Sequence, residues 1–544
     1  MANQFNSIFI RKPRRNKFNL SFQNKLTAQF GYLVPFLVQD VLPGDHFKVG
    51  ASHVIRLQPT VAPVMQNVDI YKHYFFVPMR LIWKQWEEFI TGGVSGSSTV
   101  RPPYITLTAG DDIKYLKAGS LADYLGFPSP ETTSGFDVIG RTSVNALPFL
   151  AYQLIWQEYY RDQNLMGELA TEFPFDSSST FDVPTFKGNL MTIRRRSWRK
   201  DEFTSALPWP QRSPNSVSLP VNVNTDTSIS YNAGGSTKVV GSRPSSSTSS
   251  QQLNLTTGGG MNAVQDLHIS DSNGTYIGSA NIDNSSALRA TSVSKASMAN
   301  IVELRRAFKV QEWLEAMARG GSRYVEQIRT IFGIKSSDGR MQRPIYLGGS
   351  STPLVMEQTA QTSQTSGDSV QGNLAGNGAS VTKDFIFSNR FEEHGFIIGI
   401  MSVLPRAAYF QGMPAKYLKF DRYDYYWPQF AHIGEQPITK QRLYHDYTNA
   451  NHNGDIFGYQ PRYAEYRFNN DEVHGEFRTS LRQWHMARKF DEAPNLNATF
   501  VTVQPDVVDN VMAVDSFLAA PLLCLINNNI VASRLVSKYG TSHL

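Results

Sequence analysis

The sequence predicts a mainly β protein in which one β-sandwich carries long inserted loops and a few helices. Short apolar segments with strand character recur along the chain, separated by turn residues, and no internal repeat is visible. The 39 glycines, 28 prolines and 12% aromatic content favour a loop-rich β architecture over a helical one. Length alone would allow about three or four domains in 544 residues, but the spacing of the strands favours a single sandwich with insertions.

Residues 1–29 are predicted to form a basic N-terminal arm. The first 39 residues contain six Lys or Arg and no acid, and the other 46 basic residues equal the 46 acidic ones, so the arm carries the net charge of +6. A solubilising tail is one interpretation. Contact with nucleic acid is the other, since cations release counterions from phosphates and interspersed rings stack on bases. The candidate contact residues are Arg11, Lys12, Arg14, Arg15 and Lys17.

Residues 30–212 are predicted to form the first part of the sandwich, with a helical insertion. Strand-like segments cover residues 30–41, 47–57 and 68–77, and the LPGD sequence at residues 42–45 is typical of a turn. Ring residues alternate onto both sides of the third segment, which predicts a strand that is covered on both faces. A short helical pattern follows and ends at Gly92.

A longer helix is predicted over residues 147–164, where Pro148 fits the first turn. A second basic cluster follows it at Arg194, Arg195 and Arg196. One interpretation is a solvated or salt-bridged face, because two acids follow closely and offset the charge. The other is a second contact with nucleic acid.

Residues 213–295 shift sharply to Ser, Thr, Asn and Gly. More than eighty residues are too many for an ordinary loop, so an insertion or a flexible linker is expected. The sequence GGGMNA at residues 258–263 matches a nucleotide-binding fingerprint on paper, but no strand precedes it and no helix follows, so that interpretation is rejected.

Residues 296–544 are predicted to form the second part of the sandwich. Asn300 and Glu303 begin a helix in capping-box register, and a second helix covers residues 322–332 with Gly333 at its end. A polar loop is expected over residues 350–382. Strands are expected at residues 385–387, 395–404, 457–468 and 498–503, and Cys524 is expected in the core.

The segment at residues 423–436 carries five ring residues, only two acids and no Lys or Arg. It follows neither a helical nor a strand pattern, and Pro428 interrupts it. Large rings with polar tips and few charges are typical of a protein–protein contact, but the edge of a core is the alternative. With the segment at residues 457–467, the candidate subunit-contact residues are Tyr425, Tyr426, Trp427, Phe430, Tyr459 and Tyr463.

The sequence carries no motif for catalysis or cofactor binding. No P-loop, HExxH, CxxC or GxSxG pattern occurs, and the 11 histidines are scattered. We therefore expect no enzyme activity, no cofactor and no metal site. No apolar run reaches the roughly 20 residues of a membrane helix, and no signal peptide is recognisable, so a soluble protein made and used in a reducing cytoplasm is expected.

Several stretches, in the same order along most of the chain, resemble the major capsid protein of Microviridae, in particular its gokushovirus branch. They include the run from VLPGD at residue 41 to YFFVP at residue 74, the helix sequence LPFLAYQLIWQEYYRDQN at residue 147, DEFTSALPWPQ at residue 201, and the two aromatic segments already described. The basic arm, the neutral body and the missing catalytic motifs fit a structural shell protein independently.

The resemblance implies a single eight-stranded antiparallel jelly roll of the viral capsid type, copied roughly sixty times in a T=1 icosahedral shell. It further implies a circular single-stranded DNA genome, a small basic DNA-binding protein, a minor pilot protein and a host cell-surface receptor as partners. The protein would be found in the virion and be assembled in the bacterial host cytoplasm, and residues 213–295 would form a surface protrusion at the threefold axes. The alternative is a carbohydrate-binding or glycosidase jelly roll, because aromatic platforms also suit sugars.

Overall fold

The computed structural model describes residues 14–94, 96–107, 114–129, 142–176, 184–212, 267–270, 276–280, 301–321, 323–365, 370–514 and 519–539. The chain divides into two compact units, one of residues 1–214 and 312–544 and one of residues 215–311. The smaller unit contains an antiparallel hairpin of β8 (Leu267–Ser270) and β9 (Tyr276–Ala280), and α7 (Ile301–Gly320) begins in it. Most of the predicted insertion at residues 213–295 lies outside the described residues.

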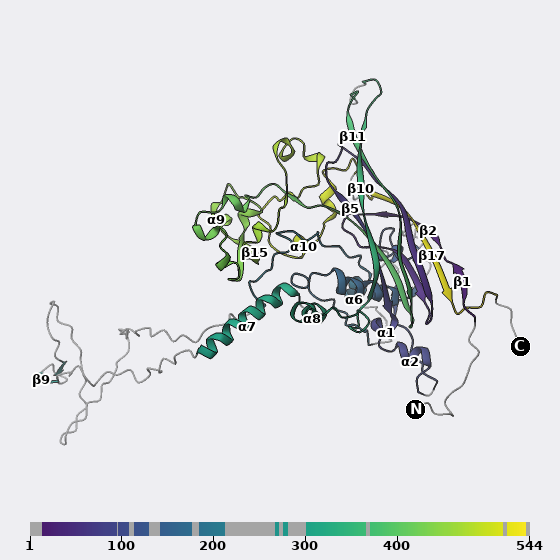
Figure 1. Ribbon diagram of the computed structural model, residues 1–544, viewed down its shortest axis with the longest axis horizontal. Helices are drawn as coiled ribbons and strands as arrows, with labels where there is room; N and C mark the ends of the chain where they lie inside the picture. Colours follow the sequence, from purple (N-terminus) through teal and green to yellow (C-terminus); the bar gives the residue numbers. More distant parts are fainter. Residues whose placement is uncertain are drawn as a thin grey trace, which may run out of the picture. The chain divides into compact units, whose positions relative to one another are not determined.

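The larger unit is built on one curled antiparallel sheet of nine strands (Figure 1). Eight strands follow the order β1-β17-β4-β11-β10-β5-β12-β3, and β2 is a ninth that pairs with β17. The predicted mainly β, jelly-roll class is therefore confirmed. The strands are β1 (Asn16–Asn19), β2 (Phe22–Ala28), β3 (Val34–Val41), β4 (His46–Thr60), β5 (Val68–Pro78), β10 (Ile345–Ala360), β11 (Leu374–Arg390), β12 (Gly395–Pro405) and β17 (Leu522–Arg534).

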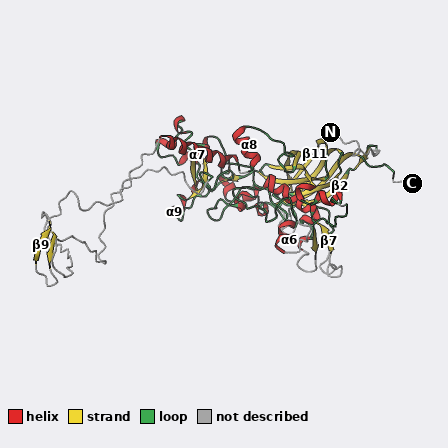
Figure 2. Cartoon of the chain, turned by 90° about the horizontal axis from the view of Figure 1, so that it is seen from below, coloured by secondary structure: helices red, strands yellow, loops and turns green. Residues whose placement is uncertain are grey.

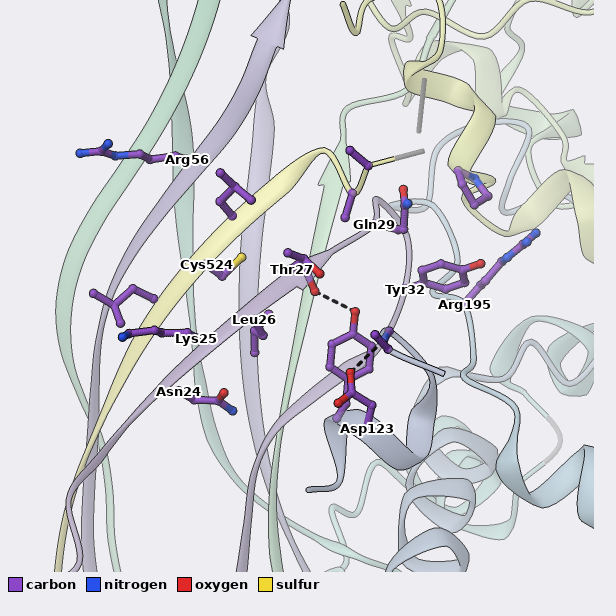
Figure 3. A pocket seen from close by; sticks show the side chains of 18 of the residues that line it. Asn24, Lys25, Leu26, Thr27, Gln29, Tyr32, Arg56, Asp123, Arg195 and Cys524 are labelled. Atoms are coloured by element: carbon purple, nitrogen blue, oxygen red, sulfur yellow. Dashed lines mark hydrogen bonds between the residues drawn. The ribbon is translucent and has the colours of Figure 1, made fainter. Parts of the chain in front are cut away.

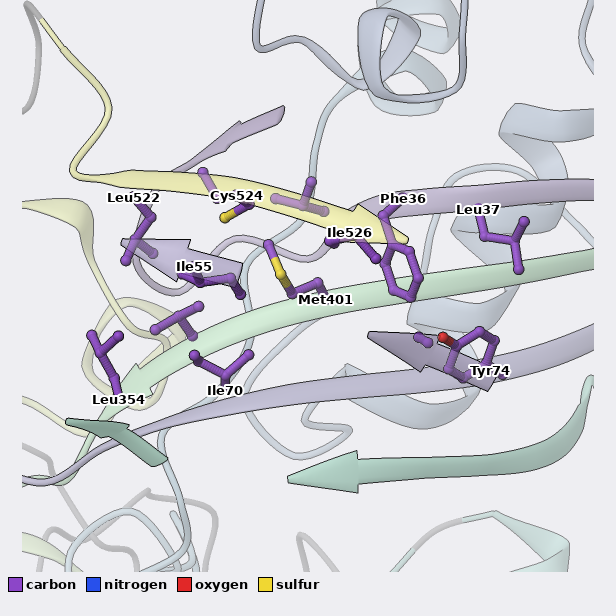
Figure 4. Close-up of a cluster of buried hydrophobic side chains, with 14 of the residues drawn as sticks. Phe36, Leu37, Ile55, Ile70, Tyr74, Leu354, Met401, Leu522, Cys524 and Ile526 are labelled. Atoms are coloured by element: carbon purple, nitrogen blue, oxygen red, sulfur yellow. The ribbon is translucent and has the colours of Figure 1, made fainter. Parts of the chain in front are cut away.

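The main core lies inside the curl of this sheet. β4 and β17 alternate buried and more exposed residues, as expected of strands with one face on a core. Side chains from both halves of the sheet converge there (Figure 4), among them Phe36, Ile55, Ile70, Met401 and Ile526. Cys524 is 5% exposed in the same core, as predicted.

Helices cover the other face of β5, β12 and β3. A second buried cluster joins Phe75 and Ile398 of the sheet to helical residues such as Leu150, so β5 is covered on both faces as predicted. The buried Tyr152 hydroxyl donates to the Leu33 carbonyl at 2.8 Å. The helices are α1 (Met79–Ile82), α2 (Trp86–Thr91), α3 (Leu121–Tyr124), α5 (Leu147–Ile155) with a π-helical turn at Trp156–Tyr160, and α6 (Pro184–Met191).

The remaining elements are short (Figure 2). Three further helices are α8 (Tyr324–Phe332), α9 (Ala450–Asn453) and α10 (Ala498–Val501). Gly333 terminates α8 in a left-handed conformation, as predicted. Small sheets pair β6 (Tyr104–Leu107) with β7 (Thr142–Asn145), β13 (Ala408–Tyr409) with β16 (Asp471–Glu472), and β14 (Glu435–Thr439) with β15 (Ile456–Pro461). No helix among the described residues is long and apolar enough to cross a membrane.

Four predictions of local structure are wrong. The strand predicted at residues 457–468 ends at Pro461, and Ala464–Tyr466 forms a 3₁₀ turn. Residues 350–382 do not form a loop, because β10 and β11 pair through them in a long hairpin whose Ser, Thr and Gly residues hide the strand pattern. Residues 498–501 are helical, because the Asn497 side chain accepts the Phe500 amide at 2.8 Å and caps the turn. The predicted arm ends early, because from Asn16 onward its residues pair with β17.

Candidate functional site

The aromatic segment lies on the surface of the subunit. Tyr425, Tyr426 and Trp427 are 55%, 52% and 47% exposed in the single chain. The segment runs through two 3₁₀ turns, Arg422–Asp424 and Pro428–Phe430, which explains why its sequence shows neither helical nor strand periodicity. About half of each of these three side chains is therefore accessible on the surface of the single chain.

The exposed rings are held in fixed positions by neighbouring groups. The Trp427 indole nitrogen donates to the Arg422 carbonyl at 2.9 Å. The ring of Tyr426 packs edge-on against Tyr463 at a centroid distance of 5.2 Å, and Phe430 packs against Tyr423 at 5.6 Å. This surface, termed the aromatic patch, consists of Tyr423, Tyr425, Tyr426, Trp427, Phe430 and Tyr466.

Two of the predicted contact residues lie outside the aromatic patch, and one of them lies beneath it. Tyr463 is 3% exposed, has a φ of +61°, and donates its hydroxyl to the Tyr423 carbonyl at 3.2 Å. Tyr459 is half-buried in β15, where its amide donates to the Leu207 carbonyl at 2.8 Å. Tyr463 therefore supports the patch from inside the subunit, whereas Tyr459 is part of the small β14–β15 sheet.

Only some of the basic residues of the arm belong to the described part of the chain. Arg11 and Lys12 lie outside the described residues, whereas Arg14, Arg15 and Lys17 are exposed. Lys17 lies on β1, opposite Ser533 of β17. The arm candidates therefore lead directly into the edge of the main sheet.

The second basic cluster is turned into the protein. The Arg194 guanidinium lies 4.6 Å from the Trp156 ring centroid and donates to Gln153 Oε1 at 2.7 Å. The Arg196 guanidinium lies 4.0 Å from the Tyr71 ring centroid and donates to Ser402 Oγ at 2.7 Å. Burial lowers the pKa of both guanidinium groups from the usual value.

Arg195 hydrogen-bonds to Gln504 and lies 5.5 Å from the Tyr32 ring centroid. The predicted salt-bridged or solvated face is therefore wrong for these three arginines, because rings, amides and a hydroxyl replace carboxylates as their partners. The neighbouring acids are used elsewhere: Asp201 accepts the Tyr409 hydroxyl at 2.7 Å, and Glu202 pairs with Arg442.

A groove of about 1120 Å³ beside this cluster combines cations with rings. Several of its cations already have acidic partners, such as Lys200 with Asp162 at 2.8 Å and Arg323 with Glu326 at 3.2 Å. Burial lowers the pKa of the His73 imidazole to about 4, so this ring is neutral at pH 7. Acidic side chains of the same subunit thus offset much of the positive charge of the groove.

A second cavity, of about 1350 Å³, lies around β2 and β17 (Figure 3). The Tyr124 hydroxyl donates across it to the Thr27 carbonyl at 2.7 Å. Burial raises the pKa of the Cys524 thiol to about 12, which keeps it protonated and unreactive. Among the described residues, no group of three or more His, Cys, Asp or Glu could hold a metal ion.

Sequence reasoning missed one set of basic side chains. Lys25, Lys48, Arg56 and Lys383 lie on four different strands and are all exposed. Each is a single cation in an otherwise ordinary strand, so no charge cluster marks it in the sequence. Only the pairing of strands far apart along the chain brings these residues onto one face, although the alternation within β4 marks Lys48 and Arg56 as outward.

Comparisons with known proteins agree with this architecture. The model of a family described as capsid protein (F protein) matches residues 7–544. The chain is 34% identical to capsid protein VP1 of Chlamydia phage 1, over 92% of this chain and 91% of that protein. It is 35% identical to capsid protein VP1 of Bdellovibrio phage phiMH2K, over 90% of this chain and 87% of that protein. It is 28% identical to capsid protein VP1 of Spiroplasma virus 4, over 97% of this chain and 95% of that protein. With a curled antiparallel sheet and an exposed, braced aromatic patch, the chain belongs to the F-protein family of phage capsid proteins as a structural major capsid protein of the Microviridae type.

Proposed function

We propose that this capsid protein assembles in about sixty copies into a closed icosahedral shell in which the aromatic patch forms a contact between subunits. The observation that carries the proposal is the exposure of Tyr425, Tyr426 and Trp427 on a braced surface. Rings that are already held in place lose little conformational entropy on binding, and an exposed aromatic cluster of this kind marks an interaction site. Such a shell places the protein in the virion.

We propose further that the shell encloses a circular single-stranded DNA genome and that the arm contacts its phosphates. Arg14, Arg15 and Lys17 are exposed and no described carboxylate pairs with them, which leaves their charges available. Arg11 and Lys12 extend the same cluster in sequence. The cluster of Arg194, Arg195 and Arg196 contributes least, because its guanidinium groups are occupied inside the subunit.

The remaining partners belong to the same proposal. They are a small basic DNA-binding protein, a minor pilot protein and a receptor on the bacterial surface, with assembly in the host cytoplasm. Residues 213–295 form the protrusion at the threefold axes. The role is structural throughout, without enzyme activity or cofactor.

Electron microscopy of the purified full-length chain tests the subunit contact. Trp427→Ala and Phe430→Ala are each expected to reduce the yield of particles at least fivefold while the yield of soluble subunit stays within a factor of two. Tyr539→Ala is the matched control, since Tyr539 is 73% exposed and lies outside the aromatic patch. An equal fall of particles and soluble subunit would show that the patch residues stabilise the subunit only.

A carbohydrate-binding or glycosidase protein is the second candidate, favoured by the same exposed rings. Stable monomers that bind or hydrolyse glycans, with no particles at any concentration, would support this candidate and refute the shell.

A further inference from the structure

One face of the main sheet carries no covering layer of helices among the described elements. β1, β2, β17, β4 and β11 direct one set of alternating residues into the core and the other set outward. On the outward side, Val381 is 75%, Phe385 71% and Leu523 43% exposed. By contrast, helices cover the outer side of β5, β12 and β3.

The strand register fixes which outward residues are neighbours. Directly paired residues of antiparallel strands point to the same side of a sheet. Leu525 pairs with Lys25 and Val54, and Leu523 pairs with Thr27 and Arg56. Figure 3 shows Lys25 and Arg56 pointing away from Tyr32 and Arg195.

The same register extends this surface along the strands. Val531 pairs with Lys48 of β4, and Ser52 of β4 pairs with both Asn527 and Lys383. The outward cations therefore share one surface, termed the basic sheet face, which consists of Lys17, Lys25, Lys48, Arg56, Lys383 and Arg390.

The strands of this surface carry mainly positive charge. All six cations are exposed, and none forms an ion pair with a described residue. β1, β2, β4 and β17 contain no Asp or Glu at all. Asp384 of β11 is directed to the opposite side, where it pairs with Lys72 at 2.9 Å. Two carboxylates, Asp123 and Asp506, line the cavity that also holds Lys25 and Arg56, so the six cations outnumber the acids beside them and the surface is suited to a polyanion.

The same charge argues against a second copy of this face as the partner. Two such faces in a symmetric contact would bring cations against cations, which destabilises association. A single-stranded nucleic acid fits better, because its phosphates match the cations and the exposed ring of Phe385 offers a surface on which a base can stack. The face is also continuous with the arm, since Arg14 and Arg15 directly precede β1.

We infer that the basic sheet face points to the interior of the shell and binds the phosphate backbone of the single-stranded DNA genome. This inference rests on the proposed function and adds an orientation to it: the uncovered side of β17, β4 and β11 is luminal. Two basic elements, the arm and the sheet, then act on the genome as one continuous surface.

The test compares two full-length variants with the same change of charge. The face variant replaces Lys25, Lys48, Arg56 and Lys383 by Gln. The control replaces Arg101, Lys335, Arg340 and Lys416 by Gln, all of them exposed cations outside the basic sheet face and without an ion pair to a described residue. The readouts are the NaCl dependence of binding of soluble protein to a fluorescent oligo-dT and the ratio of nucleic acid to protein in purified particles.

The face variant is expected to lower the slope of log affinity against log salt by about 0.7 for each lost phosphate contact, up to about 3 for four contacts. Its particles are expected to contain at most half the DNA of the unmodified ones, whereas the control retains both values. Equal slopes and equal DNA content in the two variants would overturn the inference. So would a face variant that binds oligo-dT normally but forms no particles, because this result would identify a protein contact.

A second measurement needs no variant. Lysine acetylation of intact particles is compared with acetylation of particles emptied by nuclease, followed by mass spectrometry. Protection of Lys25, Lys48 and Lys383 only in DNA-filled particles supports the inference, and equal modification in both refutes it. If the unmodified chain forms no particles at all, the proposed function is refuted. If normal particles form but their lysines are unprotected, only the inference about the basic sheet face is refuted.

Discussion

At the scale of single residues, the buried polar groups carry the clearest consequences. Lys72 is fully buried on β5, and its ammonium group pairs with Asp384 on β11. His53 on β4 donates to or accepts from Ser380 Oγ at 3.2 Å. These polar side chains lie on the core side of the main sheet, where a lost partner leaves a charge or dipole without water.

Stability is expected to fall below neutral pH because of His53. Burial, and next the charge of Lys72, lowers the pKa of its imidazole to about 4, from 6.5 in the unfolded chain. As the pH falls through 6.5 the unfolded state takes up a proton that the folded state does not, so folding loses free energy until the pH reaches about 4. Between pH 7.5 and 5 the loss from this group is about 2 kcal/mol.

Urea unfolding of the soluble subunit at both pH values measures this effect. His53→Gln is expected to lose its share of about 2 kcal/mol and to retain a similar share from His73, whose imidazole pKa is also lowered to about 4. The control His474→Gln, whose side chain is 69% exposed, keeps the full pH dependence. An unchanged pH dependence in His53→Gln would contradict the assignment.

The arginines show what a sequence can and cannot say about a residue. The Arg194–Arg196 cluster is visible in the sequence, yet its partners Trp156, Tyr71 and Gln504 are distant in the chain and determine its role. Tyr463 likewise stands in a recognisable aromatic segment, but its burial depends on the neighbouring turn at Tyr423. Residue types were thus predictable, and their environments were not.

At the scale of elements, strands with apolar alternation and helices with caps were predictable. β5, β12, α7 and α8 lie close to the expected ranges. The β10–β11 hairpin was missed because it is rich in Ser, Thr and Gly, and backbone pairing with β5 and β4 holds it in place without an apolar pattern.

The outer part of this hairpin is expected to be dispensable for folding. From Glu357 to Ala360, β10 pairs only with β11, and this ribbon extends beyond the sheet in Figure 1. A two-stranded ribbon contributes little stability by itself. Replacing residues 359–375 by Asn-Gly keeps the pairing of Gln358 with Gly376 and is therefore expected to change the free energy of unfolding by less than about 1 kcal/mol.

Thermal melting of the soluble subunit checks this prediction. Leu354→Ala, at a core position of β10 that is 4% exposed, is the control and should lose about 2–5 kcal/mol. A loss of that size in the shortened hairpin would show that the ribbon supports the sheet.

At the scale of the whole molecule, the division into two units predicts that the larger unit folds without the smaller one. Residues 1–214 and 312–544 form one compact unit that contains the nine-stranded sheet. Replacing residues 213–295 by a short Gly/Ser linker is expected to leave a soluble, folded subunit, because Ser, Thr, Asn and Gly provide little core.

Circular dichroism and the yield of soluble protein check this replacement. The control removes α5 (residues 147–155), whose buried side chains cover the sheet, and should yield insoluble protein. An insoluble linker variant would refute independent folding of the larger unit.

The pairing of β17 has a consequence for synthesis on the ribosome. β17 lies between β4 on one side and β1 and β2 on the other, so strands from opposite ends of the sequence meet in one sheet. A nascent chain that lacks residues 522–534 exposes an edge of β4 and leaves β1 and β2 without a partner. Completion of the sheet must therefore await translation of β17, and a prematurely terminated chain cannot present the finished surface that a growing shell would accept.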